Sequence, residues 1–600
     1  MSENVNGTDT IKTTIENGGK AGSGYWSGWL KRFLTLLAPA FLICFTVIFF
    51  GPLDIVNANQ MYLTFSAGSL APTFGLATIA ATAVLAAVFA FVPGRARGAV
   101  MGLLLGIAVM FYVQGAFMNQ VIGTLDGNTF DWHDFPQEAT KNILIWGGVL
   151  LVLVVLGTIF PEQSRTVAMI ASLALVAAQA VALVTTWVPA DKSTPNYQLS
   201  GDDQFEFSTG DNIIFITLDQ FNPLIFEEQL AADPALLDTF RDFLYFNNMS
   251  SCYSFTFPSL MYLATHQYFD TTVPTREAVY NAWHSDLAER FYDTLHEHGY
   301  RVNLFMESNY AALGAENMIG KADNVVEAGK LVVTPLFFEF VLDMSLYRYM
   351  PVMLKNDFCV STGGIVDIST YQGVTKLRIN YDFRDSLEKE GLHLTDEHNV
   401  FNWYHMQGAH FPYVVDGEGY YVGEDKTDRE QQLHGYLAAL GVFFDYLKDI
   451  GVYDDATIII SADHGYFECF QAVGMVKLPG ETRDHMEVTY APVAQEDIMP
   501  TILAVLGEDY TDYGTSVFDW KTGDRRVRTT RVWGYMTQFP DVEWIGNLDQ
   551  WDAEANGFER YNVFGVFHYV GDRNTILDKE RYWYNYGYAD EIQPLYDSFY

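Results

Sequence analysis

Long apolar stretches dominate the first third of the chain and are absent from the rest. Five of them approach or exceed the roughly 20 residues that an α-helix needs to cross a bilayer. They are Phe33–Gly51, Thr73–Val92, Ala99–Met118, Ile143–Phe160 and Val167–Val188. The first resembles a signal peptide, but four similar stretches follow it and no small-residue cleavage site is evident. The pattern therefore predicts an all-α bundle of five transmembrane helices over residues 26–189.

Basic residues in the short loops predict the orientation of this bundle. Lys31 and Arg32 precede the first stretch, Arg95 and Arg97 lie between the second and third, and Arg165 lies between the fourth and fifth. The alternate loops hold no basic residue or a single lysine. Because basic loops stay in the cytoplasm, the N-terminus is expected inside and the chain after the fifth helix outside. This predicts a multi-pass protein of the plasma membrane.

The segments before and after the predicted bundle are polar. Residues 1–25 are rich in Gly, Ser, Thr and Asn, which predicts a disordered cytoplasmic tail. No charged residue interrupts the five stretches, so an anchor is favoured over a transporter. Residues 190–210 are polar and are expected to form a linker.

Beyond the linker, short apolar runs alternate with amphipathic segments. The runs have the composition of buried parallel strands, and the amphipathic segments have helical periodicity. The predicted strands are Asn212–Asp219, Tyr300–Phe305 and Ala456–Ser461, and the predicted helices are Ala288–Gly299 and Leu433–Ile450. This alternation predicts an α/β domain over 211–523 with a central, mainly parallel sheet. The segment 524–600 is rich in Trp and Tyr and is expected to form a small antiparallel element.

The net charge and the cysteine content limit the classes of function that the chain can have. The formal net charge is −39, which argues against a nucleic-acid partner, because such binding needs a Lys/Arg surface. Cys252, Cys359 and Cys469 lack metal-type spacing; outside the cell they are compatible with one disulfide and one free thiol.

Two predicted strands end in residues that ligate metals. Asp219 closes the first strand, and Asp463 with His464 closes the last. The carboxyl ends of parallel strands meet at one edge of a sheet, so these side chains are expected to lie together. Alone, Asp219 could simply cap a helix, and His464 could simply hydrogen-bond within a core.

Three further pieces bear on catalysis. Thr256 stands two residues before Pro258, in a turn that opens a helix. His405 and His410 lie in the loop His-Met-Gln-Gly-Ala-His-Phe-Pro-Tyr. His485, in Arg-Asp-His-Met, is either a substrate or metal contact or a surface histidine.

The order of these pieces resembles the alkaline-phosphatase/sulfatase superfamily, most closely its lipoteichoic acid synthases and phosphoethanolamine transferases. The resemblance covers roughly residues 211–523, and five preceding helices also occur in that branch. It implies that Asp219, Asp463 and His464 hold a divalent metal, with Thr256 as nucleophile and further ligand. It also implies that His410 binds substrate. His405, from the same loop, is expected to contact substrate as well.

Departures from the superfamily patterns sharpen this expectation. Sulfatases convert a Cys or Ser to formylglycine, and Thr256 cannot undergo that conversion. They also carry paired acids, whereas Gln220 follows Asp219 here, which points to one principal metal. Oxygen ligands with one imidazole suit Mn²⁺, Mg²⁺ or Zn²⁺, and ligand type does not decide among them.

The resemblance thus implies a membrane-anchored phosphoryl-group transferase of phosphoglycerol or phosphoethanolamine type. Its expected donor is a membrane phospholipid, and its expected acceptor is an envelope glycan or lipid. Two alternatives stay open: a sulfatase-like hydrolase or phosphodiesterase, and a non-catalytic, lipid-sensing relative with the same fold.

Overall fold

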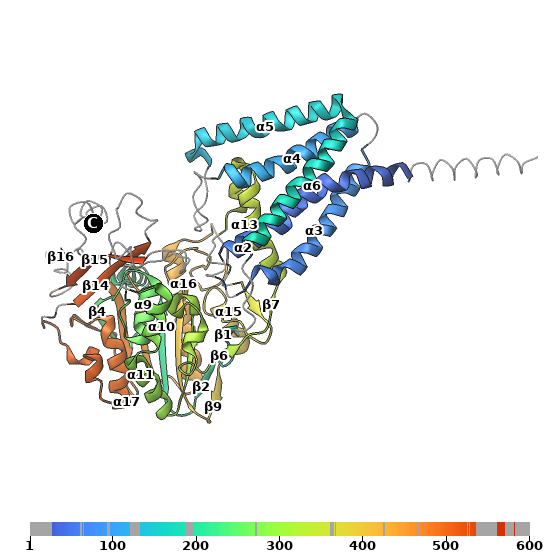
Figure 1. The fold of residues 1–600 in the computed structure, drawn as a ribbon. Helices are drawn as coiled ribbons and strands as arrows, with labels where there is room; N and C mark the ends of the chain where they lie inside the picture. The colour runs from blue at the N-terminus through green and yellow to red at the C-terminus, as the bar shows by residue number, and fades with distance from the viewer. Residues whose placement is uncertain are drawn as a thin grey trace, which may run out of the picture. The chain divides into compact units, whose positions relative to one another are not determined.

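The computed structural model describes residues 27–59, 65–92, 96–119, 132–187, 196–270, 273–360, 368–423, 426–465, 471–524, 528–535, 561–569 and 581–582, with a few single positions between these ranges. The predicted cytoplasmic tail, 1–25, lies outside them. The chain forms two compact units (Figure 1). The membrane unit comprises residues 1–194 and 330–370. Residues 195–329 and 371–600 form the second unit, which we call the catalytic unit after the role predicted for it from the sequence.

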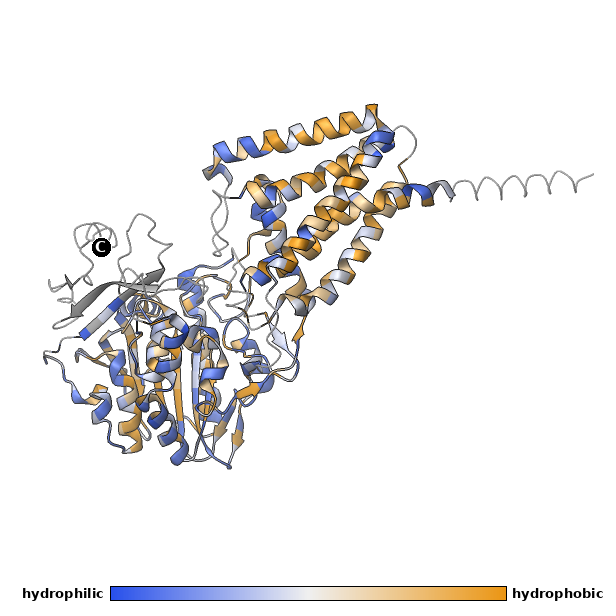
Figure 2. Ribbon diagram, viewed as in Figure 1, coloured by the Kyte–Doolittle hydropathy of each residue, from blue (hydrophilic) through white to orange (hydrophobic). Residues whose placement is uncertain are grey.

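Five apolar helices, each long enough to cross a bilayer, make up most of the membrane unit, as predicted (Figure 2). They are Ser27–Ala58, α3 (Ala67–Ala90), α4 (Arg97–Phe117), α5 (Pro136–Ile159) and α6 (Pro161–Thr185). The first contains a π-helical turn, η1 (Phe45–Phe50), followed by α2 (Gly51–Ala58). It extends past the predicted end at Gly51, so Asp54 lies within it.

Glycines bring α4 and α5 into backbone contact. Gly98, Gly102 and Gly106 are spaced four residues apart on α4 and share one face. A Cβ added to Gly102 would lie 2.6 Å from the carbonyl carbon of Leu153 on α5. Gly157 of α5 faces Gly98 in the same way. Small residues at such a crossing are the usual basis of close helix packing in membranes.

The membrane unit also contains a segment from the second half of the chain. Residues 330–370 form helix α13 (Pro335–Tyr349) and the 3₁₀ turn η5 (Val352–Phe358). The predicted domain boundaries placed this segment in the catalytic domain, 211–523, and the structure corrects that assignment. The physical reason is packing: Phe338 stacks on Phe74 of α3 at 4.5 Å, and Ser345 donates to the carbonyl of Val47 at 2.6 Å.

A seven-stranded sheet forms the centre of the catalytic unit, in the order β13-β4-β12-β11-β3-β10-β5. All of these strands run in one direction except β12, which is antiparallel to both of its neighbours. Their bounds are β3 (Asn212–Leu218), β4 (Leu244–Ser250), β5 (Tyr300–Phe305), β10 (Asn399–Met406), β11 (Thr457–Ala462), β12 (Gln471–Lys477) and β13 (Glu487–Thr489). The mainly parallel sheet agrees with the predicted fold class.

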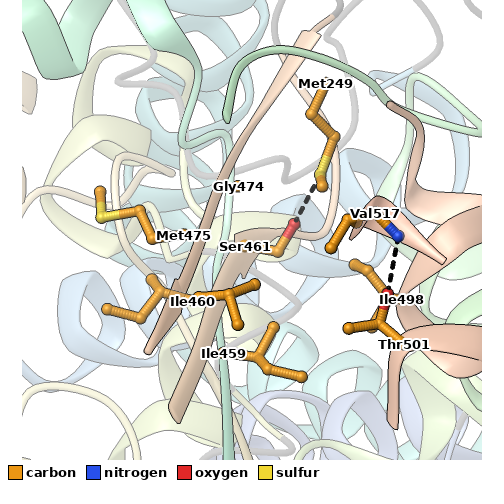
Figure 3. Close-up of a pocket in the computed structure, with 10 residues that line it drawn as sticks. Met249, Ile459, Ile460, Ser461, Gly474, Met475, Ile498, Thr501 and Val517 are labelled. Carbon is orange, nitrogen blue, oxygen red and sulfur yellow. Dashed lines mark hydrogen bonds between the residues drawn. The ribbon is translucent and has the colours of Figure 1, made fainter. Parts of the chain in front are cut away.

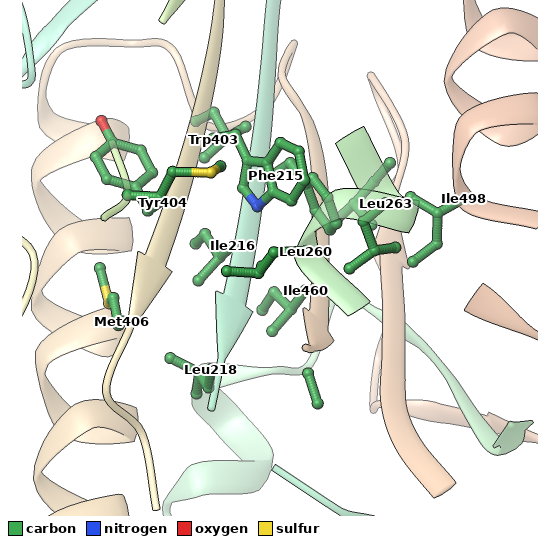
Figure 4. Packing of buried hydrophobic residues seen from close by; sticks show 14 of the residues in the cluster. Phe215, Ile216, Leu218, Leu260, Leu263, Trp403, Tyr404, Met406, Ile460 and Ile498 are labelled. Carbon is green, nitrogen blue, oxygen red and sulfur yellow. The ribbon is translucent and has the colours of Figure 1, made fainter. Parts of the chain in front are cut away.

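Helices pack on this sheet and leave its central strands fully buried. They are α7 (Pro223–Ala232), α8 (Leu236–Thr239), α9 (Thr256–Thr265), α10 (Thr275–Trp283), α11 (Asp286–Glu297), α12 (Ser308–Ala312), α15 (Phe383–Glu390), α16 (Arg429–Asp449) and α17 (Ile498–Leu506). Every residue of β3 and β11 is buried, which explains their unbroken apolar runs. Phe215, Leu260 and Trp403 lie together in the resulting core (Figure 4).

A small apolar pocket lies within this core, beside β11 and β12. Met249, Ile460, Gly474 and Ile498 contribute to its lining (Figure 3). The hydroxyl of Ser461 points toward the sulfur of Met249, 3.8 Å away. The pocket lies between the sheet and helix α17, and none of its lining residues is titratable.

Small sheets complete the unit. β1 (Tyr197–Leu199) pairs with β6 (Val325–Glu327), and β2 (Glu206–Ser208) pairs with β9 (His393–Thr395). Near the C-terminus, β14 (Arg528–Tyr535), β15 (Tyr561–Tyr569) and β16 (Arg581–Tyr582) form an antiparallel sheet, as predicted for this region.

Candidate active site

The carboxyl edge of the central sheet brings Asp219 and Asp463 side by side. β3 and β11 pair in parallel with Leu218 opposite Ala462, so the next residue of each strand is one of the two aspartates. The backbone N–H of Gln220 donates to Oδ1 of Asp463 at 3.2 Å. Gln220 has a φ of +57°, a strained value for a residue other than glycine.

Asp219, Asp463 and His464 form a buried cluster of metal-ligating groups. One ligand atom from each lies within 4.8 Å of the others. Nε2 of His464 is 3.5 Å from Oδ1 of Asp219 and 3.5 Å from Oδ2 of Asp463. Nδ1 of His464 faces the carbonyl of Gly465. If Nδ1 donates its proton there, the lone pair of Nε2 points into the cluster, as a metal ligand requires.

Unsatisfied polar atoms mark the centre of this cluster. Oδ1 of Asp219, Oδ2 of Asp463 and Nε2 of His405 are buried and have no hydrogen-bond partner among the described residues. Buried polar atoms are normally paired, so three such atoms in one place need a common partner. A divalent cation meets that need, and the oxygen-rich set with imidazole suits its chemistry.

The two carboxylates have opposite pKa shifts. Burial and the nearby charge of Asp463 raise the pKa of Asp219 above its usual value. Burial alone would raise the pKa of Asp463, but the imidazoles of His464 and His405 hold that pKa below its usual value. Asp219 is therefore the group that a cation must compete for against a proton.

Thr256 presents its hydroxyl to this cluster from the first position of α9. Its Oγ1 donates to Oδ2 of Asp219 at 3.3 Å and lies 3.4 Å from Nε2 of His464. The N-terminus of a helix carries a partial positive charge, which favours negative charge on this oxygen. The ring of Phe255, just before it, stacks on His464 with centroids 6.2 Å apart.

The two histidines of the predicted loop lie at the same edge. His405 belongs to β10 and is buried, with Nε2 3.7 Å from Oδ2 of Asp463. It therefore faces the ligand cluster directly, although the sequence suggested only a contact with substrate. His410 follows in the loop, with its carbonyl held by the side-chain amides of Gln407 and Gln432. Burial lowers the pKa of His410, while the charge of Asp463 opposes that shift.

His485 is not brought to this edge. It is exposed in the turn between β12 and β13. Because β12 runs against β11, that turn lies at the amino edge of the sheet, and a strand of this length spans roughly 20 Å. The structure thus favours the surface alternative for His485.

Two residues that support the site, Gln495 and Gly408, were not predicted from the sequence. The buried amide of Gln495 donates to the carbonyls of Ala462 and Asp463, both at 2.8 Å, and accepts from the N–H of Cys252 at 2.9 Å. It thereby joins the Asp463 turn to the loop that leads to Thr256. Gly408 lies against Asp219, whose carbonyl accepts from the N–H of Ala409 at 2.9 Å. Their partners are distant in sequence, so no local pattern could reveal them.

The site thus combines a candidate divalent-cation cluster with the hydroxyl of Thr256, at the carboxyl edge of an α/β sheet. No protein-family model matches the chain, and no curated protein does.

Comparison with solved structures finds similarities of low sequence identity. A lipoteichoic acid synthase from Listeria monocytogenes has 13% identity and a TM-score of 0.34, covering 67% of this chain and 92% of that one. A phosphonate monoester hydrolase from Silicibacter pomeroyi has 16% identity and a TM-score of 0.34, covering 65% and 94%. An alkaline-phosphatase-superfamily protein from Vibrio parahaemolyticus has 12% identity and a TM-score of 0.33, covering 69% and 92%. These are proteins of the kind that the motifs resemble.

Proposed function

We propose that this chain is a membrane-anchored, metal-dependent enzyme of alkaline-phosphatase/sulfatase type that transfers a phosphoryl group through Thr256. The observation that carries the proposal is the place of the Thr256 hydroxyl. It lies within hydrogen-bonding reach of both Asp219 and His464, at the start of a helix. A hydroxyl that merely began a helix would have no need of two metal-ligating neighbours.

Asp219, Asp463 and His464 would hold one divalent cation, with Thr256 as a further ligand and His405 facing the same point. Bound there, such a cation would favour the ionised threonine hydroxyl and offset charge on phosphate oxygens. Mn²⁺, Mg²⁺ and Zn²⁺ all fit the ligand types. The helix N-terminus supports the same ionised state from the protein side.

The first half-reaction transfers the group to the protein. Thr256 loses its proton to solvent, and its oxygen attacks the phosphorus of a phosphodiester. A phosphothreonine ester that still carries the headgroup forms as the bond to the leaving alcohol breaks. His410 delivers a proton to that leaving oxygen. A bound phosphodiester anion would raise the pKa of His410 and favour the protonated imidazole that this step needs.

The second half-reaction releases the group. An acceptor hydroxyl gives its proton to His410 and bonds to phosphorus, and the oxygen of Thr256 leaves and regains a proton. With an envelope glycan or lipid as acceptor the enzyme is a transferase; with water it is a hydrolase. A phospholipid is the donor that an anchored, outward-facing enzyme meets first, with phosphoglycerol or phosphoethanolamine as the transferred group.

The test uses the full-length protein in vesicles that contain headgroup-labelled phosphatidylglycerol or phosphatidylethanolamine. Wild type should release diacylglycerol and carry label on Thr256. Thr256→Ala should do neither, while Thr256→Ser, which keeps the hydroxyl, should retain part of the turnover. Turnover by Thr256→Ala equal to that of wild type would reject the proposal. Product analysis with and without a glycan acceptor distinguishes transfer from hydrolysis.

A further inference from the structure

The segment 330–370 is continuous with the catalytic unit at both of its ends, yet it packs within the membrane unit. The chain therefore passes between the two units at 194/195, at 329/330 and again at 370/371. An anchor needs only the first passage. The other two require a separate explanation.

Tyr349 of helix α13 packs against two glycines of the membrane spans, Gly51 and Gly115. We call this packing site the Tyr349 socket. A Cβ added to Gly51 would lie 2.7 Å from Cε2 of the Tyr349 ring, and one added to Gly115 of α4 would overlap Cε1 of the same ring and lie 2.8 Å from its Cδ1. Two glycines, from different spans, thus make room for a single tyrosine. Tyr349 is only 2% exposed. Any side chain at either glycine would push α13 away from the bundle.

Polar contacts fix the orientation of α13 in this socket. Nη1 of Arg348 donates to Oδ2 of Asp54 at 2.7 Å, and the amide of Asn119 donates to the carbonyl of Arg348 at 2.8 Å. Just beyond α13, the N–H of Val352 donates to Oδ1 of Asn142 at 3.2 Å. An acidic side chain within an apolar span needs such a partner, since an unpaired charge there is costly.

All of these contacts lie at one end of the bundle. Asp54 is near the C-terminal end of the first span, Asn119 follows α4, and Asn142 is near the start of α5. The charge bias of the loops assigns this end to the outside. Helix α13 comes from the chain after the fifth span, which the same bias also places outside. The two assignments agree.

We propose that residues 330–370 are a docking segment that ties the catalytic unit to the outer face of the membrane unit and so selects lipid donors in the same bilayer. This inference rests on the proposed function. The docked segment limits how the catalytic unit can turn at the membrane surface. It thereby raises the effective concentration of productive encounters with a membrane-bound donor. A small soluble phosphodiester needs no such orientation.

The experiment reverses the Asp54–Arg348 pair in full-length protein reconstituted into vesicles. Asp54→Arg and Arg348→Asp are made singly and together, and two activities are measured: headgroup release from labelled phospholipid, and hydrolysis of bis(p-nitrophenyl) phosphate. Each single variant should lose roughly tenfold in lipid turnover and keep its soluble turnover. The double variant, which restores an ion pair of reversed polarity, should recover lipid turnover. Equal losses on both substrates, or no loss, would overturn the inference.

Hydrogen exchange of residues 335–358 provides a readout that does not depend on activity. The segment should be protected in wild type and in the double variant, and should exchange faster in either single variant. Fast exchange in wild type would overturn the docking segment whatever the activities are. If wild type turns over neither substrate while the segment is protected, the proposed function fails and the docking stands.

Discussion

Gly408 lies so close to Asp219 that an added Cβ would sit 2.6 Å from the carbonyl oxygen of Asp219 and 2.8 Å from its nitrogen. The loop after β10 thus rests directly on the first predicted metal ligand. Gly408 also has a φ of +54°, which a side chain disfavours. Its conformation and its proximity to Asp219 together require glycine.

Gly408→Ala should therefore displace Asp219 and lower both metal affinity and turnover, by roughly tenfold or more. Gly451→Ala is the matched control. Gly451 has a φ of +77°, so alanine is strained there too, but its added Cβ would meet nothing within 4 Å. Metal titration by calorimetry compares the two. Equal loss in both variants would show that backbone strain, rather than contact with Asp219, is responsible.

Metal removal should destabilise wild type, because two buried carboxylates then face each other. Asp219→Asn removes that repulsion along with a ligand, so its melting temperature should change little on adding a chelator.

The dependence of stability on pH follows from the raised pKa of Asp219. Between the ordinary aspartate value of about 3.9 and the raised value, the folded chain keeps a proton that the unfolded chain has lost. In the metal-free protein, this stabilisation is present at low pH and disappears as pH rises through the folded pKa.

Melting curves in excess chelator at pH 5 and pH 8 measure this effect. Metal-free wild type should lose more stability over that interval than Asp219→Asn does. Parallel behaviour of the two proteins would mean that Asp219 does not hold the extra proton.

Much of this site could be predicted because its residues follow strands that are apolar throughout. β3 and β11 are buried on both faces, so their runs of Ile and Phe are plain in the sequence, and each ends at a metal-ligating residue. The expected strand at Tyr300–Phe305 coincides with β5. Strand direction then places Asp219 and Asp463 together without further information.

The features of the fold and the site that could not be predicted depend on tertiary contacts. Helix α13 has a sequence that would suit a soluble core as well as a membrane surface. Contacts with residues more than 200 positions earlier, Gly51 and Gly115 among them, decide between the two. His405 was expected to contact substrate, since nothing local shows that β10 lies next to β3. The membership of Gln495 in the site depends on a carbonyl 32 residues away.

Gln495→Glu tests the role of that amide. A carboxylate cannot donate to the carbonyls of Ala462 and Asp463, and it would face both of them while buried. We expect the Asp463 turn to loosen, with a fall in metal affinity and turnover, and a loss of stability of about 1–3 kcal/mol. Gln431→Glu, on the exposed start of α16, is the control. Metal affinity unchanged in Gln495→Glu would mean that the amide serves only the fold.

Lys355→Met should stabilise the docking segment near neutral pH. Lys355 is fully buried, donates to the carbonyl of Tyr347 and lies over its ring. Burial lowers the pKa of Lys355 to about 7. Between that value and about 10.4, the unfolded chain binds a proton that the folded chain lacks, so stability should rise with pH. Thermal unfolding between pH 7 and pH 10 should show this rise in wild type but not in Lys355→Met.

Gly102→Leu should disrupt the membrane bundle. A side chain at Gly102 would collide with the backbone of α5 at Leu153 and Val154, which cannot move aside as a flexible side chain could. Overpacking of this kind costs about 1–3 kcal/mol, and here it would also separate α4 from α5. Gly147→Leu is matched in kind, since it lies on α5 with nothing within 4 Å of an added Cβ. Unfolding in detergent should occur earlier for Gly102→Leu and at the wild-type point for Gly147→Leu. If both variants matched wild type, close contact between α4 and α5 would not hold the bundle together.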